Sequence, residues 1–481
     1  MATTNAALYD GTYVYHLAGV NVNGDCFFAG AFTVANGVIT GGEQDFSDST
    51  AAYGNAITAA GSSLSVASSG NIQVVLATTN TSIGNNGVIT LRGSKVSNAR
   101  VLISEYDAYA TGSGSIDLQT SAAAPSGGYA FVISGIDING QNLNPFSIGG
   151  ILNVSGTSVS ANGSIFDYNL LGNTPVLAQT FDSGTVSAPD QYGRVSFNLS
   201  PSPSAQLPGF ILTGYIVGTN QIQLIESQQD ALSDNLAGMA LGQGSNTGAF
   251  NASSIAGKNY AFGTTGQDIN YLVNFAGVLS FSSSGALSGP LAINDLVVQG
   301  EDTITGGSST VDATGRVTIS DIATKANPLG ANYGFQMYLD GNGNAMVMGA
   351  DTVEVSAGPA YLRTNAAPAL SGSYSIAVSG FLRDNKNNTP PWSAAGVVTV
   401  NSGSYSGFTD YNDSAITLTE NQSLSGSLDT STGVIALTGL DAISLTTASS
   451  FFDYPIDNNR VVMLSVDKFL LGLMTMENIT K

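Results

Sequence analysis

Charged residues are scarce in this chain, and basic residues are the scarcest. Asp, Glu, Lys and Arg make up 10% of the 481 residues, against about 25% in an ordinary soluble domain. The 13 basic residues face 34 acidic ones, which gives a formal net charge of −21. Binding to nucleic acid or to an anionic membrane surface requires clustered Lys and Arg, so we expect neither partner.

Histidine and cysteine are nearly absent. His16 is the single histidine and Cys26 the single cysteine, so no internal disulfide can form and nothing requires an oxidising compartment. A Ser-His-Asp triad would have to use His16, which strand alternation places on the face opposite Tyr13 and Tyr15. One His and one Cys also fall short of the usual zinc or iron ligand set. We therefore expect no cofactor and no enzymatic activity.

Long apolar runs and helical periodicity are missing too. The most apolar stretch, 461–476, is interrupted by Asp467 and Lys468, so we expect no membrane insertion. Residues 1–5 lack the basic and apolar regions of a signal peptide, so a leader is absent from the chain as given. A composition low in Lys and rich in Ser, Thr, Asn and Gly is nevertheless typical of bacterial exterior proteins. The predicted location is therefore extracellular or at the cell surface.

What the chain has in abundance is glycine and strand-forming residues. Its 58 glycines, together with many Thr, Val, Ser and Asn, disfavour helices and suit short strands joined by tight turns. Turn signals recur about every 10 to 14 residues. The sequence therefore predicts an all-β protein.

A strand pattern that starts with tyrosine and continues with large residues on alternate positions occurs four times. Its copies begin at Tyr13, Tyr129, Tyr260 and Tyr374. A return strand that contains glycine follows each copy, at Gly30, Gly150, Gly277 and Gly396. A later strand led by glycine recurs at Gly87, Gly193, Gly315 and Gly433. Each repeat then has an apolar strand ending near an aspartate, at Asp107, Asp230, Asp351 and Asp467. Because these landmarks share one order and nearly one spacing, they predict four copies of one domain.

Small, polar junctions separate the four repeats. They set the predicted domains at 1–121, 122–250, 251–368 and 369–481. About eight antiparallel strands in sequence order can close into an up-and-down, lipocalin-like barrel and so remove both sheet edges. We therefore predict four tandem antiparallel barrels or curved meanders. Immunoglobulin-like sandwiches are the alternative, although their Cys…Trp…Cys signature is missing.

Two motifs connect the repeats with known proteins. The opening reads Gly-x-Tyr-x-Phe…Ser-Gly-x-Asp-x-Asn-Gly, as at 127–140, and the closing reads Leu-Ile-Glu…Asp, as at 224–230. Both resemble tandem β-repeats of secreted or surface proteins from acidobacterial and similar soil bacteria. The likeness covers all four units, although the fourth has a long turn at 382–392. It implies a fold and a surface location, and it brings no catalytic residue with it.

A loop resembling a calcium site is the candidate metal site. Asp340, Asn342 and Asn344 supply alternate oxygen ligands, as calcium loops do. The expected glycine is missing at Ala345, however, and no bidentate Glu closes the loop. Because Asn-Gly between two apolar strands is an ordinary hairpin signal, we expect a turn and no metal requirement.

Paired acids and the single tryptophan are further candidates. Glu43 with Asp45, or Glu301 with Asp302, would suit a glycosidase only if two carboxylates faced one cleft, which acids scattered over turns do not indicate. Trp392 would stack on a sugar ring if it were exposed. Its place at the start of a return strand favours packing in the core or in a turn.

The scaffold is repeated, whereas no polar constellation is. This combination is typical of an extracellular structural or adhesive protein that acts by association, as a matrix, surface-layer or filament subunit. We expect self-association, with the apolar segment 469–476 of unit four either forming a joint or filling its own core. The alternative is a β-barrel protein that binds a glycan or a small ligand, with a glycan or a cell-surface molecule as partner.

Overall fold

The computed structural model describes residues 8–66, 70–138, 143–226, 230–269, 272–326, 333–365, 370–383, 389–413, 417–440 and 448–480. Regular structure in these ranges is β-strand apart from the short 3-10 turns η1 (Pro203–Ala205), η2 (Gly244–Asn246) and η3 (Ala252–Ser254). No helix within these ranges is long and apolar enough to cross a membrane. The prediction of an all-β chain is confirmed.

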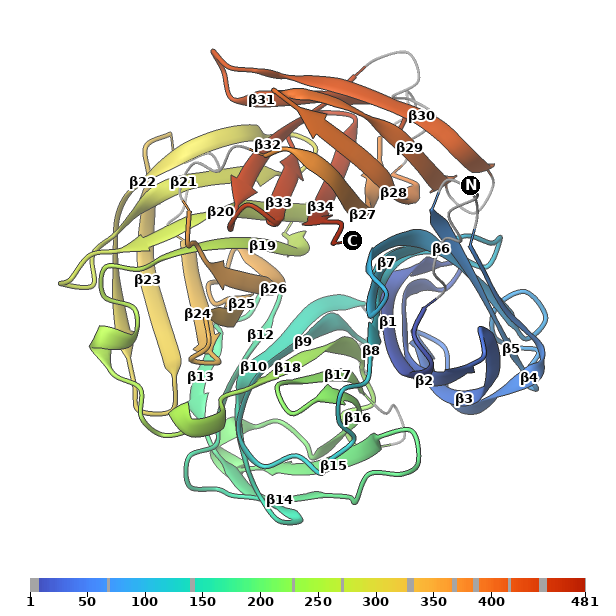
Figure 1. The fold of residues 1–481 in the computed structure, drawn as a ribbon. Helices are drawn as coiled ribbons and strands as arrows, with labels where there is room; N and C mark the ends of the chain where they lie inside the picture. The colour runs from blue at the N-terminus through green and yellow to red at the C-terminus, as the bar shows by residue number, and fades with distance from the viewer. Residues whose placement is uncertain are drawn as a thin grey trace. The chain divides into compact units, whose positions relative to one another are not determined.

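Three of the four repeats form closed barrels of eight strands (Figure 1). Barrel 1 consists of β1 (Gly11–Asn21), β2 (Gly24–Ala35), β3 (Val38–Asp48), β4 (Ala52–Val66), β5 (Asn71–Thr78), β6 (Val88–Ser97), β7 (Arg100–Glu105) and β8 (Ala110–Leu118). Barrel 3 consists of β19 (Asn259–Asp268), β20 (Leu272–Phe281), β21 (Leu287–Asn294), β22 (Gln299–Val311), β23 (Arg316–Thr324), β24 (Tyr333–Leu339), β25 (Asn344–Gly349) and β26 (Glu354–Leu362). Barrel 4 consists of β27 (Gly372–Leu382), β28 (Pro391–Asn401), β29 (Ser404–Asp413), β30 (Thr417–Asp429), β31 (Val434–Thr438), β32 (Ser449–Pro455), β33 (Arg460–Ser465) and β34 (Leu470–Asn478).

The second repeat is a variation on the same barrel. Its strands are β9 (Gly127–Asp137), β10 (Asn144–Ser155), β11 (Ser158–Val159), β12 (Ile165–Leu170), β13 (Val176–Gln179), β14 (Phe181–Val186), β15 (Arg194–Pro201), β16 (Phe210–Gly218), β17 (Gln221–Glu226) and β18 (Asn235–Gly242). Strand β10 pairs with both β11 and β12, and the sheet closes through β11 and β14. The tandem up-and-down barrels are therefore confirmed, and the sandwich alternative is wrong.

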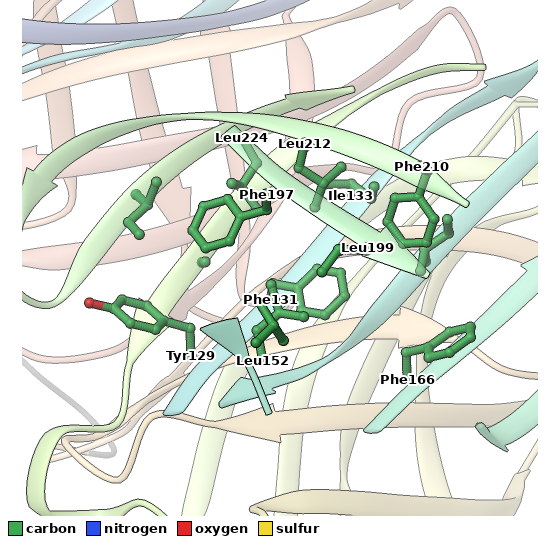
Figure 2. Close-up of a cluster of buried hydrophobic side chains, with 14 of the residues drawn as sticks. Tyr129, Phe131, Ile133, Leu152, Phe166, Phe197, Leu199, Phe210, Leu212 and Leu224 are labelled. Atoms are coloured by element: carbon green, nitrogen blue, oxygen red, sulfur yellow. The ribbon is translucent and has the colours of Figure 1, made fainter. Parts of the chain in front are cut away.

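Alternate side chains of every strand fill the barrel interiors. In barrel 2, one cluster of buried side chains includes Phe131, Phe166, Phe197 and Leu224, which come from four different strands (Figure 2). None of these four side chains is more than 2% exposed, and each contributes about 1.5–3 kcal/mol through burial. Equivalent clusters occupy barrels 1, 3 and 4. The inward alternation of the sequence therefore builds packed cores.

The landmark tyrosines lie on the first strand of each barrel, with their rings in the core. In three barrels the hydroxyl donates to a carbonyl in the turn between the sixth and seventh strands. These bonds run from Tyr13 to Asn98 at 2.8 Å, from Tyr129 to Thr219 at 3.3 Å and from Tyr374 to Asn458 at 3.0 Å. One side chain thus fills the core and fastens a turn, which explains why tyrosine recurs where phenylalanine would fill the same space.

The recurring glycine of the second strand marks a close approach of two backbones. A Cβ at Gly150 would lie 2.2 Å from the carbonyl oxygen of Ile165, and one at Gly396 would lie 2.1 Å from that of Phe408. Both distances are far below van der Waals contact. Only glycine lets the third strand pass this close, so the position supports the tight curvature of a small barrel.

The recurring aspartate holds the turn between the seventh and eighth strands. Asp230 accepts from the backbone N–H groups of Leu232 and Ser233, at 2.9 Å each, and from Ile211 of the neighbouring strand β16. Asp351 does the same with Val353, Glu354 and Gly334, and Asp107 with Tyr109 and Thr90. The landmark is therefore structural: one carboxylate satisfies the donors of a turn and ties that turn to strand six.

One correspondence predicted from the sequence is wrong. Gly193, Gly315 and Gly433 each precede the fifth strand of their barrels, whereas Gly87 precedes β6, the sixth strand of barrel 1. The true counterpart is Gly70, directly before β5. The error arose because Gly87, with φ +86°, also ends a turn, so two glycine signals compete within repeat one.

The four barrels are grouped in two compact units. Residues 120–364, which contain barrels 2 and 3, form one unit. The other unit joins residues 1–119 with 365–481, so barrel 1 packs against barrel 4 although the rest of the chain separates them. A string of repeats that contact only their sequence neighbours does not describe this pairing.

The apolar segment 469–476 does not form the exposed patch that was one of its two expected roles. It contributes most of β34, where Leu470, Met474 and Met476 are each 1% exposed and belong to the core of barrel 4. The sequence alternation simply turns these side chains inward. Any joint between molecules must therefore be sought elsewhere.

Cutting both junctions of the 120–364 unit should leave barrels 1 and 4 bound to each other. We expect this because ion pairs and hydrogen bonds hold the two barrels together without a direct chain connection between them. Protease sites inserted after Ser121 and after Asn365, followed by gel filtration at micromolar concentration, would measure it. Separate elution of the two barrels would contradict the pairing.

Candidate functional site

Each compact unit contains one contact surface between two barrels, and the two surfaces are built from corresponding strands. Seam A joins β9, β10 and β12 of barrel 2 to β24, β25 and β26 of barrel 3. Seam B joins β27, β28 and β29 of barrel 4 to β6, β7 and β8 of barrel 1. In both, the first three strand positions of one barrel meet the last three strands of the other.

A buried ion pair lies at the centre of seam A. The Oδ2 and Oδ1 atoms of Asp167 accept from Nε and Nη2 of Arg316, each at 2.7 Å. The same carboxylate accepts from the Tyr338 hydroxyl at 2.7 Å and from the Ala178 N–H at 2.6 Å. Since the side chain of Asp167 is 0% exposed and that of Arg316 10%, both charges are largely removed from water. Four donors on one carboxylate offset that desolvation.

The electrostatics of this cluster follow from burial and from one carboxylate. Burial acts to lower the pKa of Arg316, but the hydrogen-bonded Asp167 outweighs it and the pKa lies above its ordinary value. Burial, followed by the charge of Asp167, raises the pKa of Tyr338 well above its usual range. The arginine therefore stays charged and the tyrosine stays a proton donor across the physiological pH range.

An asparagine two residues after Asp167 on β12 forms hydrogen bonds to a turn of barrel 3. The amide nitrogen of Asn169 lies 3.1 Å from the carbonyl oxygen of Gly349, 3.0 Å from that of Asp351 and 2.9 Å from that of Glu354. These carbonyls belong to the turn held by the recurring aspartate. The amide thus docks barrel 2 onto the closing turn of barrel 3.

Seam B repeats this docking in the other unit. The amide nitrogen of Asn412 lies 3.1 Å from the carbonyl oxygens of Glu105 and Asp107 and 2.8 Å from that of Ala110. Asp410, two residues earlier, accepts from Asn71 at 3.2 Å, and Asn71 begins the fifth strand as Arg316 does in barrel 3. The two seams therefore use the same positions with different partners for the aspartate.

Seam B contains a further ion pair, at its edge formed by β7 and β34. Nε and Nη2 of Arg100 in barrel 1 donate to the two carboxylate oxygens of Glu477 in barrel 4, each at 2.9 Å. Nη1 of the same arginine pairs with Asp117 of its own barrel. Burial acts to lower the pKa of Arg100, but Asp117 and Glu477 outweigh it and raise it. A serine pair, Ser94 and Ser375, lies 2.6 Å apart in the same contact.

The two seams differ in their apolar content. A cluster in seam A contains the buried side chains Ala130, Val132, Ile151, Leu241, Tyr338, Met346, Met348 and Ala357. Its counterpart in seam B contains only Val96, Leu102, Ala377 and Ala395. Hydrophobic burial therefore holds seam A more strongly, whereas seam B depends mainly on polar contacts.

Sequence reasoning missed both seams, although a signal was present. The tripeptide Asp-Tyr-Asn occurs at 167–169 and again at 410–412, at corresponding places in repeats two and four. Its aspartate and asparagine face outward and make the docking contacts, while its tyrosine faces the core. Because Asp-Tyr-Asn recurs in repeats two and four only, it indicates that each of these repeats docks onto another barrel.

Buried glutamates accompany the recurring aspartate in three barrels. Glu105, Glu226 and Glu354 are at most 1% exposed. Burial, then the neighbouring Asp230, raises the pKa of Glu226 to about 10. The same two causes raise the pKa values of Glu105 and Glu354 well above their ordinary range, through Asp107 and Asp351 respectively. Glu226 is therefore uncharged at neutral pH, and burial favours the uncharged form of Glu105 and Glu354.

The single histidine, on β1, and the single cysteine, on β2, both lie in barrel 1. His16 on β1 is opposite Ala29 and Ser115, and burial lowers its pKa to about 4 despite the opposing charge of Asp117. Cys26 is fully buried in the core. Burial, followed by the nearby Glu105, raises the pKa of the Cys26 thiol well above its usual range.

The Cys26 thiol should be inert in the native protein. Since thiolate is the reactive form and the group is both buried and protonated, we expect labelling by a disulfide reagent to be on the order of 100-fold slower than in denaturant. Because Cys26 is the single cysteine, the absorbance change reports it alone. Full labelling of the folded protein within the mixing time would contradict this assignment.

The candidate calcium ligands form the turn between β24 and β25. Oδ1 of Asp340 accepts from the N–H groups of Asn342 at 2.6 Å and Asn344 at 2.9 Å, and Oδ2 accepts from the Asn344 side chain at 2.8 Å. The carboxylate is thus engaged by donors of its own hairpin. Across the described ranges, no group of three or more His, Cys, Asp or Glu side chains could hold a metal ion.

The remaining candidates lie apart from one another. Glu43 and Asp45 share one face of β3, and Glu301 and Asp302 are adjacent on β22. Trp392 is 1% exposed in the core of barrel 4, with its indole nitrogen 3.4 Å from the carbonyl oxygen of Leu471. The tryptophan is therefore a core residue and presents no stacking surface.

Comparison with known proteins gives no family. No protein-family profile and no curated protein matches the chain. Among solved structures, a mutant of the vaccine antigen transferrin binding protein B from Haemophilus parasuis matches with 9% identity and a TM-score of 0.19, over 86% of this chain and 94% of that one. A double mutant of the same antigen matches with 7% identity and a TM-score of 0.15, over 99% and 77%. At these TM-scores the likeness carries no argument, so function must be inferred from the chain's own geometry.

Proposed function

We propose that this chain acts by association, as a structural or adhesive protein outside the cell, and not by catalysis. The observation that supports this proposal most is that charged side chains form ion pairs at the contacts between barrels. The barrel interiors are packed with side chains, and the ion pairs Asp167–Arg316 and Arg100–Glu477 join one barrel to another.

The surface composition supports the same proposal. Few charges have to be desolvated when such surfaces meet, because only 10% of residues are charged. Neutral Ser, Thr and Asn side chains form hydrogen bonds across a contact at a smaller desolvation penalty than ions incur. The pairs Ser94–Ser375 and Ser113–Ser379, at 2.6 and 2.7 Å, are contacts of this kind within the molecule.

Self-association is the specific form that we propose, with a cell-surface molecule as the other partner. Negative-stain imaging of native material, together with light scattering over a range of concentrations, tests it. We expect particles larger than one chain whose fraction grows with concentration. Monomers at every concentration and in native material would overturn self-association.

A second candidate, binding of a glycan or small ligand, is favoured by one observation. At the turns between the first and second strands, Val22 is 90% and Ile269 64% exposed, in barrels 1 and 3. Apolar side chains at corresponding loop tips suit contact with a ligand at that end of a barrel. A glycan array read with the native chain and with Val22→Ser/Ile269→Ser tests it. Binding that the double variant loses would support this function.

A further inference from the structure

We infer that seam B is an exchangeable contact, through which barrel 4 of one copy packs against barrel 1 of a second copy. The inference rests on the proposed function, because it names the surface through which association takes place. The occupant is a second copy of this chain, since the complementary surface is present on the same molecule.

Seam B is a heterologous contact. Barrel 1 contributes Arg100, Ser94 and the closing turn at Asp107, whereas barrel 4 contributes Glu477, Ser375 and Asn412. The two surfaces differ and fit each other, so an opened molecule presents one of each. Two opened copies can then exchange barrels in a closed pair, or many can join head to tail.

Seam B is also the contact that opens more readily. Its apolar cluster has four side chains, against eight in seam A, and apolar burial is the non-directional part of an interface that resists opening. Its ion pair is partly accessible, since the Arg100 side chain is 32% exposed, compared with 10% for Arg316 in seam A. Polar, partly wet contacts of this type are characteristic of interfaces that form and separate.

Exchange breaks no fold. The two barrels are joined through the 120–364 unit and not by a direct connection, and each is a complete closed sheet. Barrel 4 can therefore leave barrel 1 while both keep their own strand pairing and core. Opening therefore breaks only the contacts of seam B.

The Arg100–Glu477 pair makes exchange measurable. In Arg100→Glu, position 100 meets Glu477 and Asp117, so like charges face each other within the molecule. In Glu477→Arg, two arginines face each other. When the two variants are mixed, the substituted position 100 of one copy meets the substituted position 477 of the other, and these carry opposite charges. Arg100 of the second copy meets Glu477 of the first. Exchange restores opposite charges at both seams of the pair.

The experiment mixes the two variants, one carrying an affinity tag, and measures mass by gel filtration with light scattering. We expect the mixture to form a complex of twice the monomer mass that contains both variants, more abundant than any dimer of either variant alone. The double variant Arg100→Glu/Glu477→Arg restores opposite charges at positions 100 and 477 within one chain, whereas Asp117 faces a like charge at position 100 just as it does in Arg100→Glu. It should form no more dimer than the wild type, which shows that the substitutions allow folding. A mixture that contains no mixed dimer would overturn the inference.

The outcome also separates this inference from the proposed function. If wild-type material polymerises in images while the variants fail to form mixed dimers, association stands and its joint lies elsewhere. If mixed dimers form while native material is monomeric throughout, exchange stands and self-association as the function fails.

Discussion

Asp167→Ala is expected to lower the unfolding free energy of the 120–364 unit by about 3–5 kcal/mol, the usual cost of breaking a buried pair from one side. Arg316 would keep its charge in a site that is 10% exposed, and the Tyr338 hydroxyl and the Ala178 N–H would lose their acceptor. Urea denaturation followed by tyrosine fluorescence gives the change in midpoint, with the m-value as a check on compactness.

The matched control is Asp410→Ala at the corresponding position of seam B. There the nearest arginine nitrogen, on Arg92, is 3.8 Å away, and that arginine also reaches Glu420 at 2.7 Å and Gln73. We expect a loss of only about 1–2 kcal/mol, since no charge is left alone. Adding Arg316→Met to Asp167→Ala should recover much of the loss. Equal losses for the two aspartates would show that the Asp167 network is not the main polar contribution to seam A.

The second large effect is a loss of stability as pH rises above about 5. Glu226 has a pKa of about 10 in the folded chain, against an ordinary value of 4.5, and the pKa values of Glu105 and Glu354 are raised by the same causes. The folded state therefore binds more protons than the unfolded state between these limits. Stability from these groups is fully present below the ordinary pKa and is lost as pH rises toward the folded one.

The slope of this loss is about 1.4 kcal/mol per pH unit for each glutamate that stays protonated only in the folded state. Asp48 acts at the other end of the range. Burial acts to raise its pKa, but hydrogen bonds from Asn23, Asn21 and Thr50 outweigh it and lower it, so its contribution disappears only as the solution becomes more acidic than its ordinary pKa. His16 acts in the same direction as Asp48, because its pKa of about 4 lies below its ordinary value of 6.5. We expect maximal stability at mildly acidic pH, where the gain from the glutamates is balanced by the loss from these two groups.

Melting temperatures at pH 5, 7 and 9 for the wild type and for Glu226→Gln measure the effect. The variant cannot ionise at this position, so its melting temperature should fall less between pH 5 and pH 9. Asp182→Asn, which removes an acid from an exposed position on β14, controls for the change in net charge. The same pH dependence in the wild type and in Glu226→Gln would refute the role of this carboxyl.

The fold could be read from the sequence because its landmarks each act within a single barrel. Tyr129 fills a core and holds a turn, Gly150 lets one strand pass another, and Asp230 satisfies a turn. Each requirement is local in the barrel and recurs with it, so repetition exposes it. The periodicity of two then fixes which side chains face inward.

The seams could not be read in the same way. Asp167 and Asn169 occupy outward positions, where a polar residue is the ordinary expectation for water. Their burial depends on a second barrel, and strand periodicity contains no information about which barrel that is. The pairing of barrels 1 and 4 is further hidden because the residues involved, such as Arg100 and Glu477, are unlike those of seam A.

The separation of barrel 1 from barrel 4 along the chain also has a consequence for biosynthesis. The intervening 245 residues, 120–364, take on the order of 12–50 s to translate at roughly 5–20 residues per second. Barrel 1 can fold as soon as its eighth strand emerges, yet its partner does not exist until that interval has passed. On a message read by several ribosomes, a barrel 4 released by the chain ahead arrives first. Slow translation of residues 120–364 would therefore favour chains joined to one another through seam B. Few ribosomes per message would favour monomers in which barrels 1 and 4 of the same chain pair.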